Sequence, residues 1–170
     1  MGSTVIGNED YNYVSNEIEV DNFIDYMIFE SYIGNMDWPR NNVRFFAIQD
    51  GPFRFVLYDL DRVATVDIDN TPLSFINDSG TDNVVTDLFN VLYANESFKN
   101  TYDTRFNDLI NTGLLSSDRF NGIVTEYKSN IEHIMPAQIN KYEHPESYTE
   151  WYLNIEQLKN NFEAREDYLQ

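Results

Sequence analysis

Asp37, Asn42 and Asp59 are the residues of this chain whose types and order could support metal-assisted chemistry on a phosphate ester. Transfer of a phosphoryl group from ATP needs one carboxylate that orients or deprotonates the attacking hydroxyl. It also needs one or two hard oxygen ligands that hold magnesium against the phosphates. Asn42 lies five residues after Asp37, and Asp59 follows a predicted pair of strands. Two carboxylates and an amide in this order indicate a site for a divalent cation and a phosphate.

The segment before these residues has the pattern of an amphipathic helix. Apolar residues recur at helical spacing over 22–33, and Asp21 is a suitable N-cap. Gly34-Asn35 should end the helix, because glycine accepts the left-handed backbone found after helix C-termini. The polar stretch 35–42 then predicts a loop that carries Asp37.

A β-hairpin is predicted between Asn42 and Asp59. Two β-type runs, 43–48 and 53–58, are separated by the turn sequence Gln49-Asp50-Gly51-Pro52. The chain leaves along one strand and returns along the next, so Asn42 and Asp59 should lie at the same end of the hairpin. Protein kinases place an Asp, an Asn and a second Asp on a helix, loop, hairpin and turn in this order.

Each of these residues also has an ordinary structural explanation. Asp37, before Trp-Pro, could form an Asx turn, and Asn41 and Asn42 could be turn residues that open a strand. The acidic residues after the second strand could be a solvated strand end or a calcium site. That acidic group consists of Asp59, Asp61, Asp67 and Asp69.

The remainder of the chain predicts a mainly helical α+β fold. Residues 1–19 and 62–82 are polar and should be irregular, the second as a long loop. Helices are expected over about 83–94, 96–111, 116–141 and 146–168, with Ser116 or Ser117 as the cap of the third. Pro136 should kink or split that third helix near Met135.

Composition excludes several classes of function. The 170 residues are 42% hydrophobic and 15% aromatic, which is enough for one packed domain or lobe. Eleven basic against 29 acidic residues give a net charge of −18, which disfavours nucleic acid and anionic membranes as partners. The lack of cysteine excludes disulfides and zinc–thiolate sites. No apolar run is long enough for a membrane span, and His133 and His144 lack a tight metal-ligand spacing.

The motif Asn35-Met36-Asp37-Trp38-Pro39-Arg40-Asn41-Asn42, with the segment 20–26 before it, resembles the signature of the CotH family of spore-coat and surface kinases. That family places an apolar strand ending in Tyr-Asp-x-Asp after the motif, as Leu57-Tyr58-Asp59-Leu60-Asp61 does here. Two later segments resemble its helix after the active site and its closing helix. The residues concerned are Phe98, Arg105-Phe106, Leu109-Ile110-Asn111-Thr112, and Trp151 with Phe162-Glu163-Ala164-Arg165.

The resemblance covers residues 20–169 and implies the C-terminal lobe of a protein-kinase-like fold, with the hairpin between a catalytic-type loop and a metal-binding turn. Residues 1–19 are then a tag remnant, which Met1-Gly2-Ser3 resembles, and a flexible lead-in. No lysine precedes Lys99, and no glycine-rich loop is recognisable before the helix. We therefore expect the N-lobe of the same chain, with its nucleotide-binding residues, to be missing.

The resemblance also assigns roles to single residues. Asp37 matches the catalytic-loop Asp, which acts as a base or orients the hydroxyl. Asn42 matches the second metal ligand, with Asn41 as the alternative if the register shifts by one. Asp59 matches the metal-binding Asp after the hairpin, and Asp61 is the alternative. The loop-shaping residues are Trp38 and Pro39, together with Asn35, which could bond across the loop.

The implied activity is transfer of the ATP γ-phosphate to Ser or Thr of coat or surface proteins, with magnesium or manganese as the metal and none required for folding. The implied location is extracellular, at a cell surface or spore coat, and the isolated fragment should be inactive. Two other hypotheses stay open: a non-catalytic binding or assembly module of a surface or spore coat, and a calcium-stabilised structural domain. The undamaged set of Asp37, Asn42 and Asp59 favours the enzyme over the binding module, and the lack of EF-hand spacing disfavours the calcium-stabilised domain.

Overall fold

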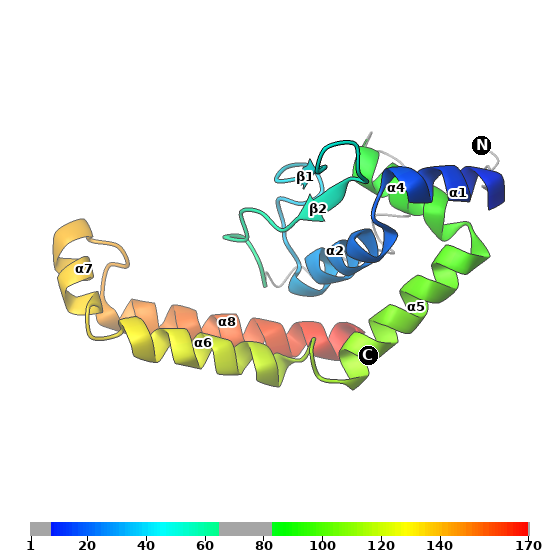
Figure 1. Cartoon of the computed structure of the whole chain (residues 1–170). Helices are drawn as coiled ribbons and strands as arrows, with labels where there is room; N and C mark the ends of the chain where they lie inside the picture. The colour runs from blue at the N-terminus through cyan, green and yellow to red at the C-terminus, as the bar shows by residue number, and fades with distance from the viewer. Residues whose placement is uncertain (1–7, 65–82, 170) are drawn as a thin grey trace.

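A computed structural model of the chain describes residues 8–64 and 83–169, so most of the predicted long loop, with Asp67 and Asp69, lies outside the described residues. Within those residues the chain forms seven helices and one antiparallel hairpin, which confirms the mainly helical α+β class (Figure 1). No described helix is both long and apolar enough to cross a membrane. The elements are α1 (Asn8–Glu17), α2 (Val20–Ile33), β1 (Arg44–Phe46), β2 (Arg54–Val56), α4 (Val84–Tyr93), α5 (Glu96–Asn111), α6 (Ser117–Ile131), α7 (Met135–Tyr142) and α8 (Tyr148–Leu169).

Helix α2 lies at the centre of the core, and nine of its residues are buried. The prediction of Asp21 as N-cap was wrong: the helix begins at Val20, directly after Glu19, and Asp21 lies in its first turn. There an acidic side chain still interacts favourably with the helix dipole. The predicted end of the helix is confirmed. Gly34 has a left-handed backbone, and the backbone N–H groups at this cap donate to the carbonyls of Glu30 and Ser31.

The polar N-terminal segment is not irregular throughout, which corrects the predicted lead-in over residues 1–19. Residues Asn8–Glu17 form α1, and Tyr11 and Val14 pack against the core cluster. Buried Ile18 forms a parallel bridge with Phe53. Packing and strand pairing thus outweigh the weak helix propensity of the Asn and Ser residues in this segment.

The hairpin is confirmed, although its paired strands are only three residues each. Arg44 pairs with Val56 and Phe46 with Arg54. The hairpin lies against α2 because the Asn22 side chain both accepts from and donates to the Phe55 backbone, at 2.6 and 3.2 Å. Phe55 also packs its ring on Phe23 and Tyr26 of α2. The hairpin is thereby fixed relative to the loop that follows α2.

Helices α4 and α5 are capped by asparagines, and Asn83 and Asn95 accept hydrogen bonds from the first turns of the helices they precede. The largely apolar α4 buries only one face: Phe89 and Leu92 lie in the core, whereas Val84 is 74% exposed. Phe89 packs on Phe98 and Tyr102 of α5, which joins the two helices.

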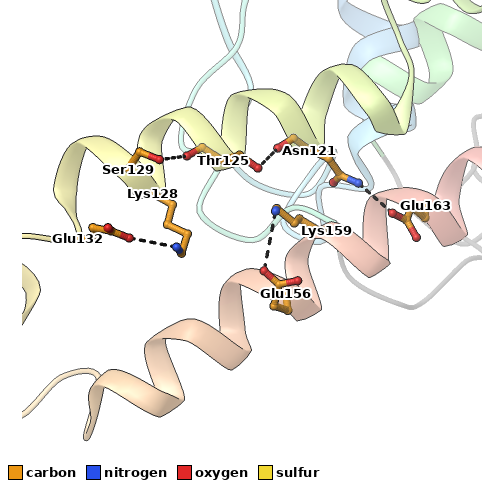
Figure 2. Close-up of polar contacts among 8 residues, drawn as sticks. All are labelled: Asn121, Thr125, Lys128, Ser129, Glu132, Glu156, Lys159 and Glu163. Carbon is orange, nitrogen blue, oxygen red and sulfur yellow. Dashed lines mark hydrogen bonds and ion pairs between the residues drawn. The ribbon is translucent and has the colours of Figure 1, made fainter.

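Helices α6 and α8 form an antiparallel pair that extends away from the rest of the molecule, with α7 at its far end (Figure 1). Near the core, Phe120 stacks on Phe162, and the Ser117 N–H donates to Glu166. Figure 2 shows that Asn121 Nδ2 donates across the pair to Glu163 at 3.0 Å, whereas most of the other drawn bonds stay within one helix.

The predicted third helix is split, as Pro136 indicated. Helix α6 begins after Ser116, whose hydroxyl accepts from the Arg119 N–H, and ends at Ile131. Helix α7 begins at Met135 with Pro136 in its first turn. The N–H groups of a first turn have no partner within the helix, so the N–H that proline lacks costs no hydrogen bond there. The single helix predicted over 116–141 is therefore two.

Candidate functional site

An open pocket of about 640 Å³ lies between the loop after α2, the open end of the hairpin and the start of α4. Asp37, Asn42 and Asp59 all line it, although 22 residues separate the first from the last. The other lining residues are Pro39, Arg40, Asn41, Val43, Arg44, Asn83 and Val84. The folded chain thus brings together three polar residues whose order in the sequence suggested a common site.

The hairpin brings Asn42 and Asp59 to the same end, as predicted. Asn42 comes two residues before β1 begins at Arg44, and Asp59 three residues after β2 ends at Val56. Both have left-handed backbones, with φ of 60° and 55°. Asn and Asp tolerate this conformation better than other residues with a side chain. The two positions therefore have a backbone reason for their residue types besides any chemical one.

The Asp37 carboxylate is half-buried at the pocket wall and is paired with a cation. Arg62 donates from Nη1 to Asp37 Oδ1 at 3.0 Å, and the Arg62 carbonyl accepts from the Met36 N–H. The Asn41 N–H donates to the Asp37 carbonyl at 2.7 Å, which closes a tight turn. Asp37 is thus held at its backbone on both sides, while its carboxylate faces an exposed arginine.

Helix α2 holds the loop on either side of Asp37. Tyr26 and Glu30, one turn apart on α2, bond to Trp38 and Asn35 respectively: Trp38 Nε1 donates to the Tyr26 hydroxyl at 2.7 Å, and Asn35 Nδ2 donates to Glu30 Oε2 at 2.9 Å. Asn35 Oδ1 then accepts from the Asp37 N–H at 3.2 Å. The buried side chains of Asn35 and Trp38 therefore attach the loop to α2.

Burial perturbs the ionisation of both α2 anchors. Desolvation raises the pKa of the Glu30 carboxyl to about 7, and the hydrogen bond from Asn35 opposes the rise only in part. Desolvation and the nearby Glu30 carboxylate raise the pKa of Tyr26 well above its usual value. The carboxyl next to the loop therefore changes charge near neutral pH.

The end of α2 is closed by Arg165, which comes from α8. Its buried guanidinium donates to the carbonyls of Ser31 and Tyr32, in the last turn of α2, where a helix supplies few partners for its own carbonyls. It lies so close to Gly34 that a β-carbon there would overlap it. The position before the loop accordingly needs glycine for space as well as for its φ of 61°.

The charge around the pocket differs from that of the whole chain. Residues 37–62 contain four Asp and four Arg, whereas the chain carries 29 acidic and 11 basic residues. Two of these arginines, Arg40 and Arg44, line the pocket beside the carboxylates. Arg44 lies over the Tyr58 ring, and Arg40 forms no ion pair with any described residue. The pocket can therefore offer both oxygen ligands for a cation and guanidinium groups for an anion.

The other predicted residues separate into two groups. Pro39 and Asn41 line the pocket, whereas Asp61 is exposed and does not. His133 and His144 are exposed at the distal end of the α6–α8 pair. In the part of the chain that the structure describes, no three acidic or histidine side chains are grouped closely enough to hold a metal.

The family model for the CotH kinase protein matches residues 4–169, which is nearly the whole chain. The chain belongs to the CotH kinase family. No curated protein and no solved structure gave a significant match. The motif around Asp37 that suggested this family is the loop that α2 holds and that lines the pocket.

Sequence reasoning missed several residues around this CotH-family site. Asn83, the cap of α4, also donates to the Pro39 carbonyl and so ties the far wall of the pocket to the loop. No short-range pattern could show a bond across 44 residues. Glu30 did leave a signal: it is the one charged residue between Tyr26 and Ile33, within an otherwise apolar or weakly polar helix segment. Ionisable side chains in such segments are rarely buried without a partner.

Proposed function

We propose that this CotH-family chain contributes the metal and hydroxyl side of a kinase site that transfers the γ-phosphate of ATP to Ser or Thr of a protein. The observation that supports the proposal is that Asp37, Asn42 and Asp59 line one pocket. In kinases these are the residue types, in this order, that orient the attacking hydroxyl and hold magnesium.

The donor set of the pocket fits magnesium or manganese. Magnesium binds hard oxygen ligands and usually takes only one or two carboxylates, with substrate phosphates and water completing its shell. Asp59 and the Asn42 side-chain oxygen would hold it, with Asp61 less suited because it lies outside the pocket. When bound, the metal would neutralise charge on the phosphate oxygens.

Asp37 would act on the acceptor hydroxyl. Its carboxylate would accept the hydrogen bond from the Ser or Thr hydroxyl, direct the oxygen lone pair toward phosphorus and take the proton as the new P–O bond forms and the bond to the leaving ADP oxygen breaks. Arg62 neutralises Asp37 in the free chain and, being exposed, can leave it when a substrate arrives.

Arg40 and Arg44 would bind the transferring phosphate or its neighbours. Guanidinium groups bind phosphate oxygens through paired hydrogen bonds, and both side chains line the same pocket as the carboxylates. Their presence supports a phosphate ligand over a bare cation, because a site for calcium alone would gain nothing from two arginines.

The hairpin supports the proposal that a nucleotide-binding lobe packs against this one. Its apolar side chains are exposed, including Phe45 at 54% and Tyr58 at 46%. An apolar patch of this kind is usually covered by a partner. We propose the adenine-binding N-lobe of the kinase as that cover, and spore-coat or cell-surface proteins as the phosphate acceptors.

Manganese titration followed by NMR tests the proposed metal site, because the paramagnetic ion broadens the resonances of residues near it. We expect broadening confined to the surroundings of Asp37, Asn42 and Asp59, stronger with ATP present. Asp59→Ala should abolish this pattern, whereas the matched variant Asp61→Ala, outside the pocket, should keep it.

Diffuse broadening that neither variant changes would overturn the proposed site, since an acidic surface attracts cations without binding them specifically. It would favour the alternative of a non-catalytic surface or coat-assembly module. Loss of broadening in Asp61→Ala with retention in Asp59→Ala would move the metal ligand from Asp59 to Asp61.

A further inference from the structure

Glu30 is a buried carboxyl that the proposed chemistry does not use. Its side chain is 1% exposed and comes from the middle of the core helix. Oε2 accepts from Asn35, whereas Oε1 has no hydrogen-bond partner among the described residues. A buried carboxyl with half of its acceptors unused is costly. Structural packing alone would be served better by an apolar residue, so the carboxyl calls for another explanation.

We propose that Glu30 is a positioning residue, whose carboxylate fixes the orientation of the Asn35 amide and thereby the backbone of Asp37. The catalytic meaning of this role rests on the proposed function of Asp37. The contacts that support it are the bond from Asn35 Nδ2 to Glu30 and the bond from the Asp37 N–H to Asn35 Oδ1.

The orientation of the Asn35 amide depends on which neighbouring groups can donate. An ionised carboxylate only accepts hydrogen bonds, so it selects the NH₂ end of the amide. The carbonyl end then faces the Asp37 N–H and accepts from it. A protonated Glu30 can donate from its hydroxyl and so pair with the amide oxygen instead. The amide would then be reversed, and its NH₂ group would face the Asp37 N–H, donor against donor.

Burial decides where this change occurs, because desolvation is the main cause of the raised Glu30 pKa. Among the described residues, the ionisable groups on the neighbouring elements are few. On α2, Tyr26 lies one turn before it and Tyr32 two residues after it, and both hydroxyls stay neutral because burial raises their pKa. From α8, the Arg165 cation bonds to Ser31 and Tyr32, and Glu166 lies close enough to influence Tyr32. From the loop, Asn35 donates to Glu30. With the Glu30 pKa raised to about 7, the two amide orientations should exchange near neutral pH.

The test is an NMR pH titration of the whole chain, which needs neither nucleotide nor activity. The Glu30 carboxyl carbon, the Asn35 side-chain amide and the Asp37 backbone amide are followed together. We expect all three to shift with one midpoint near 7. An Asp37 amide that stays constant while the Glu30 carbon titrates would overturn the proposal, and so would a Glu30 carbon that stays ionised throughout.

Two variants separate positioning from mere packing. Glu30→Gln has the same shape and keeps an acceptor for Asn35, so it should abolish the step at Asp37 while the fold remains. Asp21→Asn removes a carboxylate from the first turn of the same helix and should leave the step unchanged. A step that persists in Glu30→Gln would refute the role of Glu30.

Failure of this proposal can be told apart from failure of the proposed function. Manganese broadening could fail while the Asp37 amide still titrates with Glu30, which would refute the metal site and leave the positioning intact. Specific broadening without a coupled titration would refute the positioning and leave the metal site intact.

Discussion

Replacing Glu30 by glutamine should change how the stability of the chain depends on pH. The Glu30 carboxyl has a pKa of about 7 in the folded chain, against 4.5 for an unperturbed carboxyl. A shift of this size corresponds to about 3 kcal/mol of differential stability, at about 1.4 kcal/mol for each unit of pKa. The pKa of Glu30 is higher in the folded chain than in the unfolded chain, so the bound proton stabilises the fold. This stabilisation is complete at pH values below the pKa of the unfolded chain, and it is lost as the pH rises through the pKa of the folded chain.

The assay is urea denaturation of the wild-type chain and of Glu30→Gln at matched pH values, because the difference between them cancels every other titrating group. From about pH 5 to about pH 8, the free energy of unfolding of the wild type should fall by about 2–3 kcal/mol relative to that of the variant. A difference that stays constant over this range would refute the inference that Glu30 is held in a desolvated site.

Two further substitutions test how the loop is held. Gly34→Ala should lower the free energy of unfolding by about 2–4 kcal/mol, because it combines a left-handed backbone with overlap on Arg165. Gly113→Ala has a similar φ, but its β-carbon would meet only Ser116 Oγ at 3.9 Å, an ordinary contact, so it should cost only about 1 kcal/mol in the same urea assay. Equal losses would contradict the role of Arg165. Tyr26→Phe removes the hydroxyl that accepts from the buried Trp38 N–H and should cost about 1–3 kcal/mol, whereas an unchanged stability would show that the bond contributes nothing.

The sequence was informative wherever the determinants are local. The end of α2 at Gly34, the turn chemistry of the hairpin and the division at Pro136 each depend on residues within a few positions of the feature. Backbone preference decides such features before any tertiary contact forms. The common end for Asn42 and Asp59 follows from the hairpin by simple geometry.

Prediction failed where distant contacts decide. The polar α1 forms because Tyr11 and Val14 reach the core, and the residue after it pairs with Phe53. Nothing in its local pattern indicates this pairing. Helix α2 begins after Glu19, and not after the predicted Asp21, for a similar reason. The Glu19 N–H donates to the Phe53 carbonyl, and this distant contact fixes where the helix begins.

The candidate site divides in the same way. The residues that face the pocket belong to one continuous motif and its hairpin, so their types and order could be read directly. Two of the supporting residues come from distant segments: Arg165 lies 133 residues beyond its partner Tyr32, and Asn83 lies 44 residues beyond Pro39. Nothing in the sequence next to either residue indicates that it supports the site.

The bond from Arg165 to the end of α2 also has a consequence for the order in which the chain folds. The first 64 residues contain the loop, the hairpin and both α2 anchors, yet the cation that closes the helix emerges from the ribosome more than a hundred residues later. Closing so long a loop is entropically costly and tends to come late in folding. The nascent chain should therefore carry an α2 whose last carbonyls lack the Arg165 cation until α8 has docked, whereas the bonds from Tyr26 and Glu30 to the Asp37 loop can form earlier.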